Sequence, residues 1–515
     1  MKDGIRQSMA WLHTWTGLIF GWLMYVIFLF GTVSYWQEEI TRWMQPEVTV
    51  LADPATSIDG AMRYLQRTAP DAKVWYITPP NARSATTELY WEPGRETPNE
   101  VTEARLDGNG VPVHARETRG GNFLYRFHYD LYAVPIVFAR YLVGIAAMLM
   151  LIALVSGVII HKKIFADFFL LRFGKGHRSW LDAHNVTSVL ALPFHLMISY
   201  TGLVTLATLY MPWAIAANYA SVNDFYTAAY PRAMAERTGH PAPLVPFSVI
   251  ATGLSQSKSP DRISYVQISS PGDTAARISV TKSASSSVDT RGDTYEFSGV
   301  TGKAMAQPTV RGGAVVTESV MIGLHTARYA GIVLRWFYFL SGIAGTAMIA
   351  TGLVLWTVKR RKRMLDPEKP HLGFRIVERL NIAVIAGFPG ALATYFIANR
   401  LLPTVMPHRA EWEIRCLFLT LAAAFVLGCC RPVRRAWTET LAIGGLLFAA
   451  VVAVDAVTSP RWLLPSLRDG DWVFVGFDTV MLVTAAALGF AAWRAGRPAK
   501  LRVPRRQRDH RHAAA

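Results

Sequence analysis

The stretch LDAHNVTSVLALPFHLMISYTGL, residues 181–203, guides the interpretation of the whole chain. It opens a segment, residues 183–223, that contains no Asp, Glu, Lys or Arg, and a helix needs about 20 such residues to cross ~30 Å of hydrocarbon. His184 and His195 lie 11 residues apart in this segment. At ~100° and ~1.5 Å per residue, one straight helix would place both rings on the same face, about 16 Å apart. The stretch therefore predicts a transmembrane helix with two imidazoles on one face, as two cofactors stacked beside one helix would need.

Seven other segments are also free of charged residues, and they lie at residues 14–36, 141–161, 336–358, 380–399, 416–430, 441–454 and 479–493. The chain has 515 residues, of which 51% are hydrophobic and only 17% are charged. Long apolar blocks within such a composition are typical of membrane proteins. We therefore expect a membrane all-α helical bundle with about eight transmembrane helices, surrounded by membrane lipid.

Basic residues indicate how the bundle is oriented, because Lys and Arg stay on the cytoplasmic side of a membrane. They cluster before the first span, after every second span and at the C-terminal end, for example at Arg6, Lys162, Lys163, Lys359 and Arg431. Both termini are thus expected in the cytoplasm, as in a protein of the bacterial inner membrane. The net charge of +17 is explained by this topology, so we expect no nucleic-acid partner.

Two long segments, residues 37–134 and 213–320, fall on the periplasmic side of this arrangement. In each, a helical pattern (residues 57–70 and 247–257) precedes several short strand-like runs. We expect two small α+β domains. The predicted order is transmembrane helix 8–36, domain 37–134, helix 135–161, loop 162–182, helix 183–212, domain 213–320, helix 321–358, basic loop 359–375, a four-helix extension 376–494 and a basic tail 495–515.

The first part of the chain repeats itself. Aligning His13 with His184 also aligns Gly31 with Gly202, and aligning Arg140 with Arg335 places Gly157 on Gly352. The pattern predicts a helix–domain–helix unit used twice in parallel orientation, which is a known way to build a site between two halves of a membrane protein. The residues after about position 373 have no counterpart, so the last four helices form a separate addition.

Six histidines lie at membrane-related positions, namely His13, His128, His161, His184, His195 and His325. One histidine near a helix end is usually an interfacial hydrogen-bonding residue, but six at related positions favour ligands of haem iron. No CxxCH motif occurs, and the three cysteines, all within residues 416–430, have no evident redox role. The pattern predicts two b-type haems.

The depth of each histidine suggests which residues share a haem. His13, His161 and His184 lie at cytoplasmic ends of spans, and His13 with His184 is favoured because they match between the repeats. His128 and His325 also match and serve either an outer haem or the substrate. His195 lies between these levels and is a candidate partner of His325 or His128. Met24 is a weaker candidate ligand. The glycines in the spans are interpreted first as helix-packing positions.

These features resemble the PepSY-associated transmembrane-helix family. The resemblance rests on LHTWTGLIFG (residues 12–21), the LVSG run (154–157), LDAHNVTSVLALPFHLMISYTGL (181–203) and GLHTARYAGIVLRWFYFLSG with TGLVLW (323–356). Residues 192–203 are similar to the iron-regulated branch, which includes inner-membrane ferric-siderophore reductases with b-type haem.

The resemblance implies electron transfer to periplasmic Fe(III)–siderophore, with release of Fe(II). It carries the family's membrane histidines onto His13, His184, His195 and His325, and also onto His128. His161 stands where the second repeat has Trp356. No catalytic residue is identified.

The electron donor is a quinol or a separate flavoprotein, because no P-loop or GxGxxG nucleotide domain follows the spans. Two other functions stay open at this point. One is a non-enzymatic accessory or regulatory membrane protein whose outer domains bind partners. The other is a metal or siderophore transporter whose histidines line a path.

Overall fold

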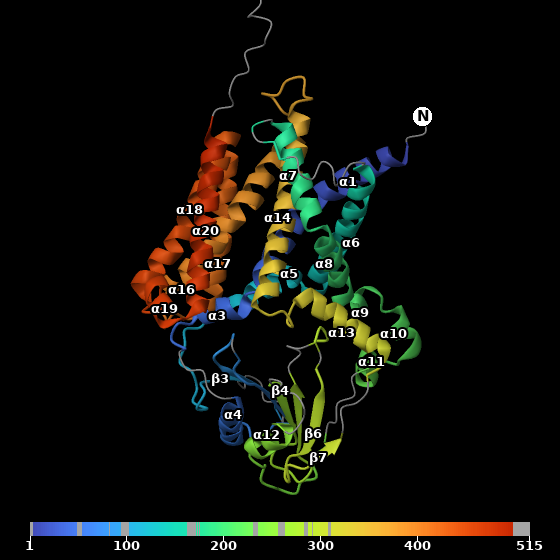
Figure 1. Ribbon diagram of the computed structural model, residues 1–515, viewed down its shortest axis with the longest axis vertical. Coiled ribbons are helices and arrows are strands. Elements are labelled where there is room, and N and C mark those ends of the chain that lie inside the picture. The colour runs from blue at the N-terminus through green and yellow to red at the C-terminus, as the bar shows by residue number, and fades with distance from the viewer. Residues whose placement is uncertain are drawn as a thin grey trace, which may run out of the picture.

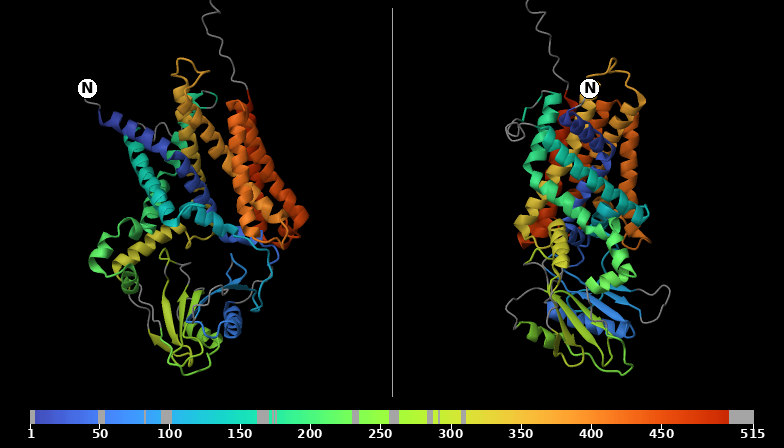
Figure 2. Two further views of the ribbon diagram at one scale, coloured as in Figure 1. Left: turned by 180° about the vertical axis from the view of Figure 1, so that it is seen from behind. Right: turned by 90° about the vertical axis from the view of Figure 1, so that its right-hand side faces the viewer.

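The computed structural model describes residues 4–48, 54–81, 83–93, 102–161, 171–172, 174, 176–229, 235–255, 263–282, 287–290, 292–306 and 311–497. These residues form a bundle of helices with one β-sheet at one end of it (Figure 1). We refer to that end as the sheet side and to the other as the helix-only side. The start of α1 (Ile5–Ile19) and the end of α20 (Trp472–Gly496) both lie on the helix-only side, as all three views show (Figure 2). Of the predicted basic tail 495–515, the residues from position 498 onward lie outside the described residues. Lys162 and Lys163 lie outside them as well.

Six helical segments of the described chain are long and apolar enough to cross a membrane, and two bent helix pairs bring the possible total to eight. The six are α6 (Ile136–Ile160), α14 (Ile332–Arg361), the continuous segment Leu372–Leu401, α17 (Arg409–Cys430), α18 (Val433–Thr458) and α20. The segment Leu372–Leu401 consists of α15 (Leu372–Asn381), the π-helical turn η2 (Ile382–Ala386) and α16 (Gly387–Leu401). The sequence therefore located the apolar helices correctly.

The first and third predicted spans are bent, which differs from our expectation of straight helices. α1 meets α2 (Gly21–Ser34) at 66°, and α7 (His177–Leu190) meets α8 (Leu192–Thr205) at 68°. In the second case Pro193 stands in the first turn of α8, where it has no N–H to donate and its ring obstructs a continuing helix. The break separates His184 from His195, so the prediction of one straight helix is wrong. Both rings nevertheless hydrogen-bond to carbonyl groups of α14, at Met348 and Ser341.

The same helix packing occurs twice, once in each repeat. α1 packs against α6, as α7 packs against α14; α2 packs against α5 (Gly120–Asp130), as α8 packs against α13 (Gly313–Thr326). The repeats also exchange contacts, since α6 packs on α8 and α14 packs on α2. α5 and α13 are separate helices that precede the spanning helices α6 and α14. The predicted helix 321–358 is therefore two helices.

The predicted outer segments do not form two independent domains, because their strands share one sheet. The seven strands are β1 (Val74–Thr78), β2 (Thr87–Glu92), β3 (Glu103–Leu106), β4 (Ile263–Ser269), β5 (Arg277–Lys282), β6 (Thr294–Ser298) and β7 (Ala304–Ala306). Their order is β3-β2-β1-β4-β5-β6-β7, all antiparallel. β1 pairs with β4, with Val74 opposite Ser269. This pairing gives hydrogen-bond partners to two strands that would otherwise be exposed edges.

One apolar core serves both halves of the sheet. Two helices, α4 (Pro54–Thr68) and α12 (Phe247–Ser255), contact each other, and their buried residues Ile58 and Phe247 belong to the same cluster as Trp75 and Ile268 from the strands. The remaining short helices are α3 (Gln37–Met44), α9 (Ala207–Tyr210), α10 (Trp213–Asn218), α11 (Val222–Ala229) and α19 (Leu463–Asp469). The outer segments therefore form one unit.

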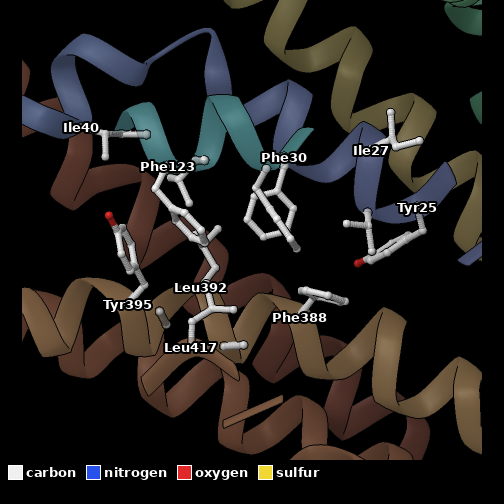
Figure 3. Close-up of a cluster of buried hydrophobic side chains, with 14 of the residues drawn as sticks. Tyr25, Ile27, Phe30, Ile40, Phe123, Phe388, Leu392, Tyr395 and Leu417 are labelled. Atoms are coloured by element: carbon white, nitrogen blue, oxygen red, sulfur yellow. The ribbon is translucent and has the colours of Figure 1, made fainter. Parts of the chain in front are cut away.

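The four C-terminal spanning segments form a group that packs on the first repeat. Figure 3 shows Phe30 and Phe123, from α2 and α5, facing Phe388 and Leu392 of α16 in a shared apolar cluster. Polar contacts reinforce this boundary, since Tyr395 donates a hydrogen bond to the carbonyl oxygen of Gly120 at 2.9 Å. The addition therefore supports α2 and α5. Their counterparts in the second repeat, α8 and α13, have no comparable packing against the C-terminal segments.

Candidate functional site

Four of the six predicted histidines form two close ring pairs. In the first pair, His13 of α1 and His184 of α7 have ring centroids 6.2 Å apart, with an angle of 70° between the ring planes. In the second pair, His128 of α5 and His325 of α13 have centroids 6.0 Å apart and planes at 30°. Each pair joins matching positions of the two repeats. The structure therefore brings distant helices together at two imidazole pairs.

Each of these four rings is oriented by a backbone carbonyl. The carbonyl oxygen can only accept, so the Nδ1 atom of each ring donates the hydrogen bond and carries the proton. In a neutral imidazole the lone pair then lies on Nε2. This arrangement is typical of histidines that ligate metals, because the bond at one nitrogen fixes the tautomer and the ring orientation. The four bonds run from His13 to Ala153 (2.8 Å), His184 to Met348 (2.9 Å), His128 to Ile27 (2.7 Å) and His325 to Ile198 (3.1 Å).

A glycine lies against each of the four rings. A Cβ atom built at the glycine would come within 2.6–3.2 Å of the Cε1 atom of the histidine, which is too close for a side chain without movement of the ring. The contacts are Gly157 with His13, Gly352 with His184, Gly31 with His128 and Gly202 with His325. These glycines therefore do more than bring helices together, since they leave room for the rings themselves.

The spacing of each pair suits an iron atom between the rings. An imidazole nitrogen binds a first-row metal at about 2 Å, so two opposed Nε2 atoms lie roughly 4 Å apart and the ring centroids roughly 6 Å apart. No group of three or more His, Cys, Asp or Glu side chains suited to a metal ion occurs among the described residues. Two imidazoles alone leave a metal with few ligands, whereas a porphyrin supplies four more nitrogens and takes histidine as an axial ligand. The residues therefore fit haem better than a bare metal ion.

The two pairs lie toward opposite ends of the first part of the bundle. Gly31, against His128, follows His13 by 18 residues, and Gly202, against His325, follows His184 by the same number. A straight helix would rise roughly 27 Å over 18 residues, and the bends shorten that distance. One pair is thus near the helix-only side and the other near the sheet side.

His195 belongs to neither pair. Its fully buried ring hydrogen-bonds through Nε2 to the carbonyl oxygen of Ser341 at 3.3 Å and lies edge-on to Phe28 at 6.2 Å between centroids. His128 and His325, its suggested partners, face each other. Met24, the matching residue of the first repeat, is buried in the apolar core. The structure therefore supports neither suggested pairing of His195.

His161 also lies outside the pairs. It ends α6, and its Nε2 atom accepts a hydrogen bond from the Asn185 side chain at 3.1 Å. The nitrogen that would bind iron is thus occupied. Alignment of the repeats had placed His161 opposite Trp356 and not opposite another histidine. That mismatch already indicated that His161 is not part of a histidine pair.

Sequence reasoning missed the backbone partners of the histidines and the role of the glycines. The matching positions Gly31 with Gly202 and Gly157 with Gly352 were visible in the repeat. Nothing in the sequence indicated that Gly31 lies against His128 and not against His13, which is nearer in the sequence. Carbonyl partners carry no sequence signal, because every residue has a carbonyl group.

Residues 10–359 match the family described as the PepSY-associated TM region, and this match covers well over half of the chain. The chain therefore belongs to that family and is a multi-pass membrane protein. All four paired histidines fall inside the matched region, and the four C-terminal spanning segments fall outside it. The sequence matches no curated protein.

Proposed function

We propose that this member of the PepSY-associated transmembrane family binds two b-type haems, one between each histidine pair, and carries electrons across the bacterial inner membrane to ferric siderophore in the periplasm. In this proposal the sheet side is periplasmic and the helix-only side is cytoplasmic. The proposed activity is that of a ferric-siderophore reductase.

The observation that carries this proposal is the repeated geometry of the two ring pairs. Centroid distances of 6.2 and 6.0 Å, Nδ1 atoms committed to carbonyl oxygens and a glycine at every ring recur at all four positions. Structural histidines satisfy their own hydrogen bonds and have no need of this shared arrangement. Four neutral imidazoles with Nε2 lone pairs are suited to axial ligation of iron.

When bound, haem iron supplies a one-electron couple whose potential is set by its axial ligands and their surroundings. His13 and His184 would hold the cofactor on the helix-only side, and His128 and His325 would hold it on the sheet side. The carbonyl bonds keep the rings in place, and the apolar helices around them exclude water. His195 and Phe28 occupy the level between the pairs.

A haem held by His13 and His184 would accept electrons from the donor, and a haem held by His128 and His325 would supply them to the substrate. With a quinol as donor, loss of two electrons and two protons yields one quinone and reduces two Fe(III) to two Fe(II). A separate flavoprotein would supply the same electrons without this proton release at the membrane. Fe(II) then leaves the siderophore, because hard oxygen ligands hold it less tightly than Fe(III).

Spectroscopy of the purified full chain tests the proposal. Protein made in haem-supplied cells should show a b-type reduced-minus-oxidised spectrum and contain two haems per chain. In proteoliposomes with a trapped reductant, addition of ferric siderophore outside should oxidise these haems and produce Fe(II) that a chelator captures. Liposomes that contain the double variant His184→Ala and His325→Ala are the matched control. Colourless wild-type protein would refute the redox proposal and leave an accessory protein or a transporter.

A further inference from the structure

One face of α14 continues past the first histidine pair toward the helix-only side. Gly345 lies against His195, and Gly352 lies against the ring of His184. Trp356 and Arg360 follow Gly352 at intervals of four residues, which places them on the same face, one and two turns farther on. The face that borders the first pair therefore ends in an indole and a guanidinium group.

Neither group has a hydrogen-bond acceptor or a carboxylate partner among the described residues. The Nε1 atom of Trp356 is buried and has no hydrogen-bond acceptor among the described residues. The guanidinium of Arg360 lies over the Trp356 ring, 4.3 Å from its centroid, and also over Trp15 of α1 at 5.7 Å. No carboxylate of the described chain pairs with Arg360, whereas the adjacent Arg361 is paired with Glu378 at 2.6 Å. The two groups together leave an N–H donor and a cation available for an anion.

Arg360 also connects the two helices that border the first pair. Trp15 lies two residues after His13 on α1, and Trp356 lies on α14, whose Met348 carbonyl and Gly352 contact His184. Stacking on two indoles fixes the guanidinium at this end of the pair. A basic loop is expected at a cytoplasmic helix end, but that rule accounts for the charge and not for this placement.

We propose that Arg360 and the Trp356 N–H bind the propionate carboxylates of the porphyrin held between His13 and His184. This inference rests on the proposed function. A carboxylate is the one anionic group that the porphyrin carries, and a charge-assisted bond from guanidinium is among the stronger polar contacts in proteins. The contact turns the propionate edge of the first haem toward the helix-only side.

Among the described residues near the sheet-side pair, the arginine that stacks on an indole of the spanning helices is already paired. Arg335 lies 5.2 Å over Trp36 near the sheet side, but its Nη1 atom donates to Glu39 at 2.7 Å. Its charge is therefore already neutralised. The proposal thus concerns the first pair alone.

Three full-length variants test the proposal: Arg360→Gln, Trp356→Phe and the control Lys359→Gln. The control removes the neighbouring charge, which belongs to the same end of α14 but stacks on neither indole. Each is combined with His325→Ala, so that the first pair alone is loaded. Removing the Arg360 cation disfavours the reduced haem, so we expect its midpoint potential to fall. A fourth variant, Arg360→Lys, should keep most of the wild-type potential, and Lys359→Gln should lower the potential less than Arg360→Gln does.

Haem dimethyl ester, in which both propionates are esterified, provides a second readout. We expect the ester to bind wild-type apoprotein at the first pair roughly tenfold more weakly than protohaem does, the effect of losing one hydrogen bond to a charged group. Arg360→Gln should discriminate between the two pigments less than the wild type does, because only the Trp356 N–H remains. If wild-type protein binds two haems but Arg360→Gln and Trp356→Phe change neither the potential nor the discrimination against the ester, this inference fails while the proposed function stands. Wild-type protein without haem would instead refute the proposed function itself.

Discussion

The two histidine pairs occupy matching positions in the repeats, but different parts of the molecule support them. The first pair lies on α1 and α7, the leading halves of the two bent helix pairs. The second lies on α5 and α13, short helices that connect the bundle to the sheet (Figure 1). In α13, Ser319 hydrogen-bonds to Asp289 from the loop between β5 and β6, and Arg311 pairs with the same carboxylate. We therefore expect the geometry of the second pair to depend on the sheet more than that of the first.

The largest expected effect separates the pairs completely. His184→Ala and His325→Ala should each remove half of the haem, because each ring supplies one axial ligand in the proposed function. The two variants should lose different haem populations. Haem content and reduced-minus-oxidised spectra of the purified variants check this. His161→Ala is the matched control and should keep both haems. If His184→Ala and His325→Ala remove the same population, our assignment of the pairs is wrong.

Gly31→Ala should damage the second pair almost as strongly. The new Cβ atom would lie 2.6 Å from Cε1 of His128, so the ring must move from its carbonyl partner. Gly157→Ala should affect the first pair less, since its Cβ would lie 3.2 Å from His13. Gly17→Ala is the control, because nothing lies within 4 Å of its Cβ position. The ratio of the two haem populations is the measurement, and equal losses in Gly31→Ala and Gly17→Ala would contradict the role given to the glycine.

Asp289→Ala should have a smaller effect, confined to the second pair. It removes the carboxylate that ties α13 to the sheet, so His325 should become less ordered while His13 and His184 keep their positions. We expect a broader spectrum and a shifted midpoint potential for one haem population only. Asp224→Ala, in the exposed α11 helix, is a control for loss of charge on the sheet side. A shift of both populations would show that the pairs are not supported independently.

His195→Leu should have the smallest effect on haem content. The ring hydrogen-bonds to the carbonyl oxygen of Ser341 at 3.3 Å and lies against Phe28 and Phe194, so both haems should be retained with a modest change in potential. Pyridine haemochrome analysis of the variant decides this. Loss of a complete haem would restore His195 as an axial ligand, as the family resemblance had implied.

Much of the fold could be predicted from local pattern. Charge-free runs located the apolar helices, and the alignment of His13 with His184 identified the repeat. The bends could not be located in this way, although Pro193 was a visible signal for one of them. The single sheet was also missed, because the pairing of β1 with β4 joins strands about 190 residues apart in the sequence, and alternating burial within a strand does not name its neighbour.

The sequence by itself determined which residues are available, namely the apolar spans, the four matched histidines and the glycines one repeat apart. Those features are local or periodic, and hydrophobicity and alignment detect them directly. Alignment of the repeats also favoured the pairing of His13 with His184, which the structure confirms. Only the tertiary structure decided that His128 meets His325, that His195 and His161 stand apart, and that Arg360 stacks on Trp15 and Trp356. These choices depend on the bends and on backbone carbonyls of distant helices, whose positions are fixed only when the helices pack together.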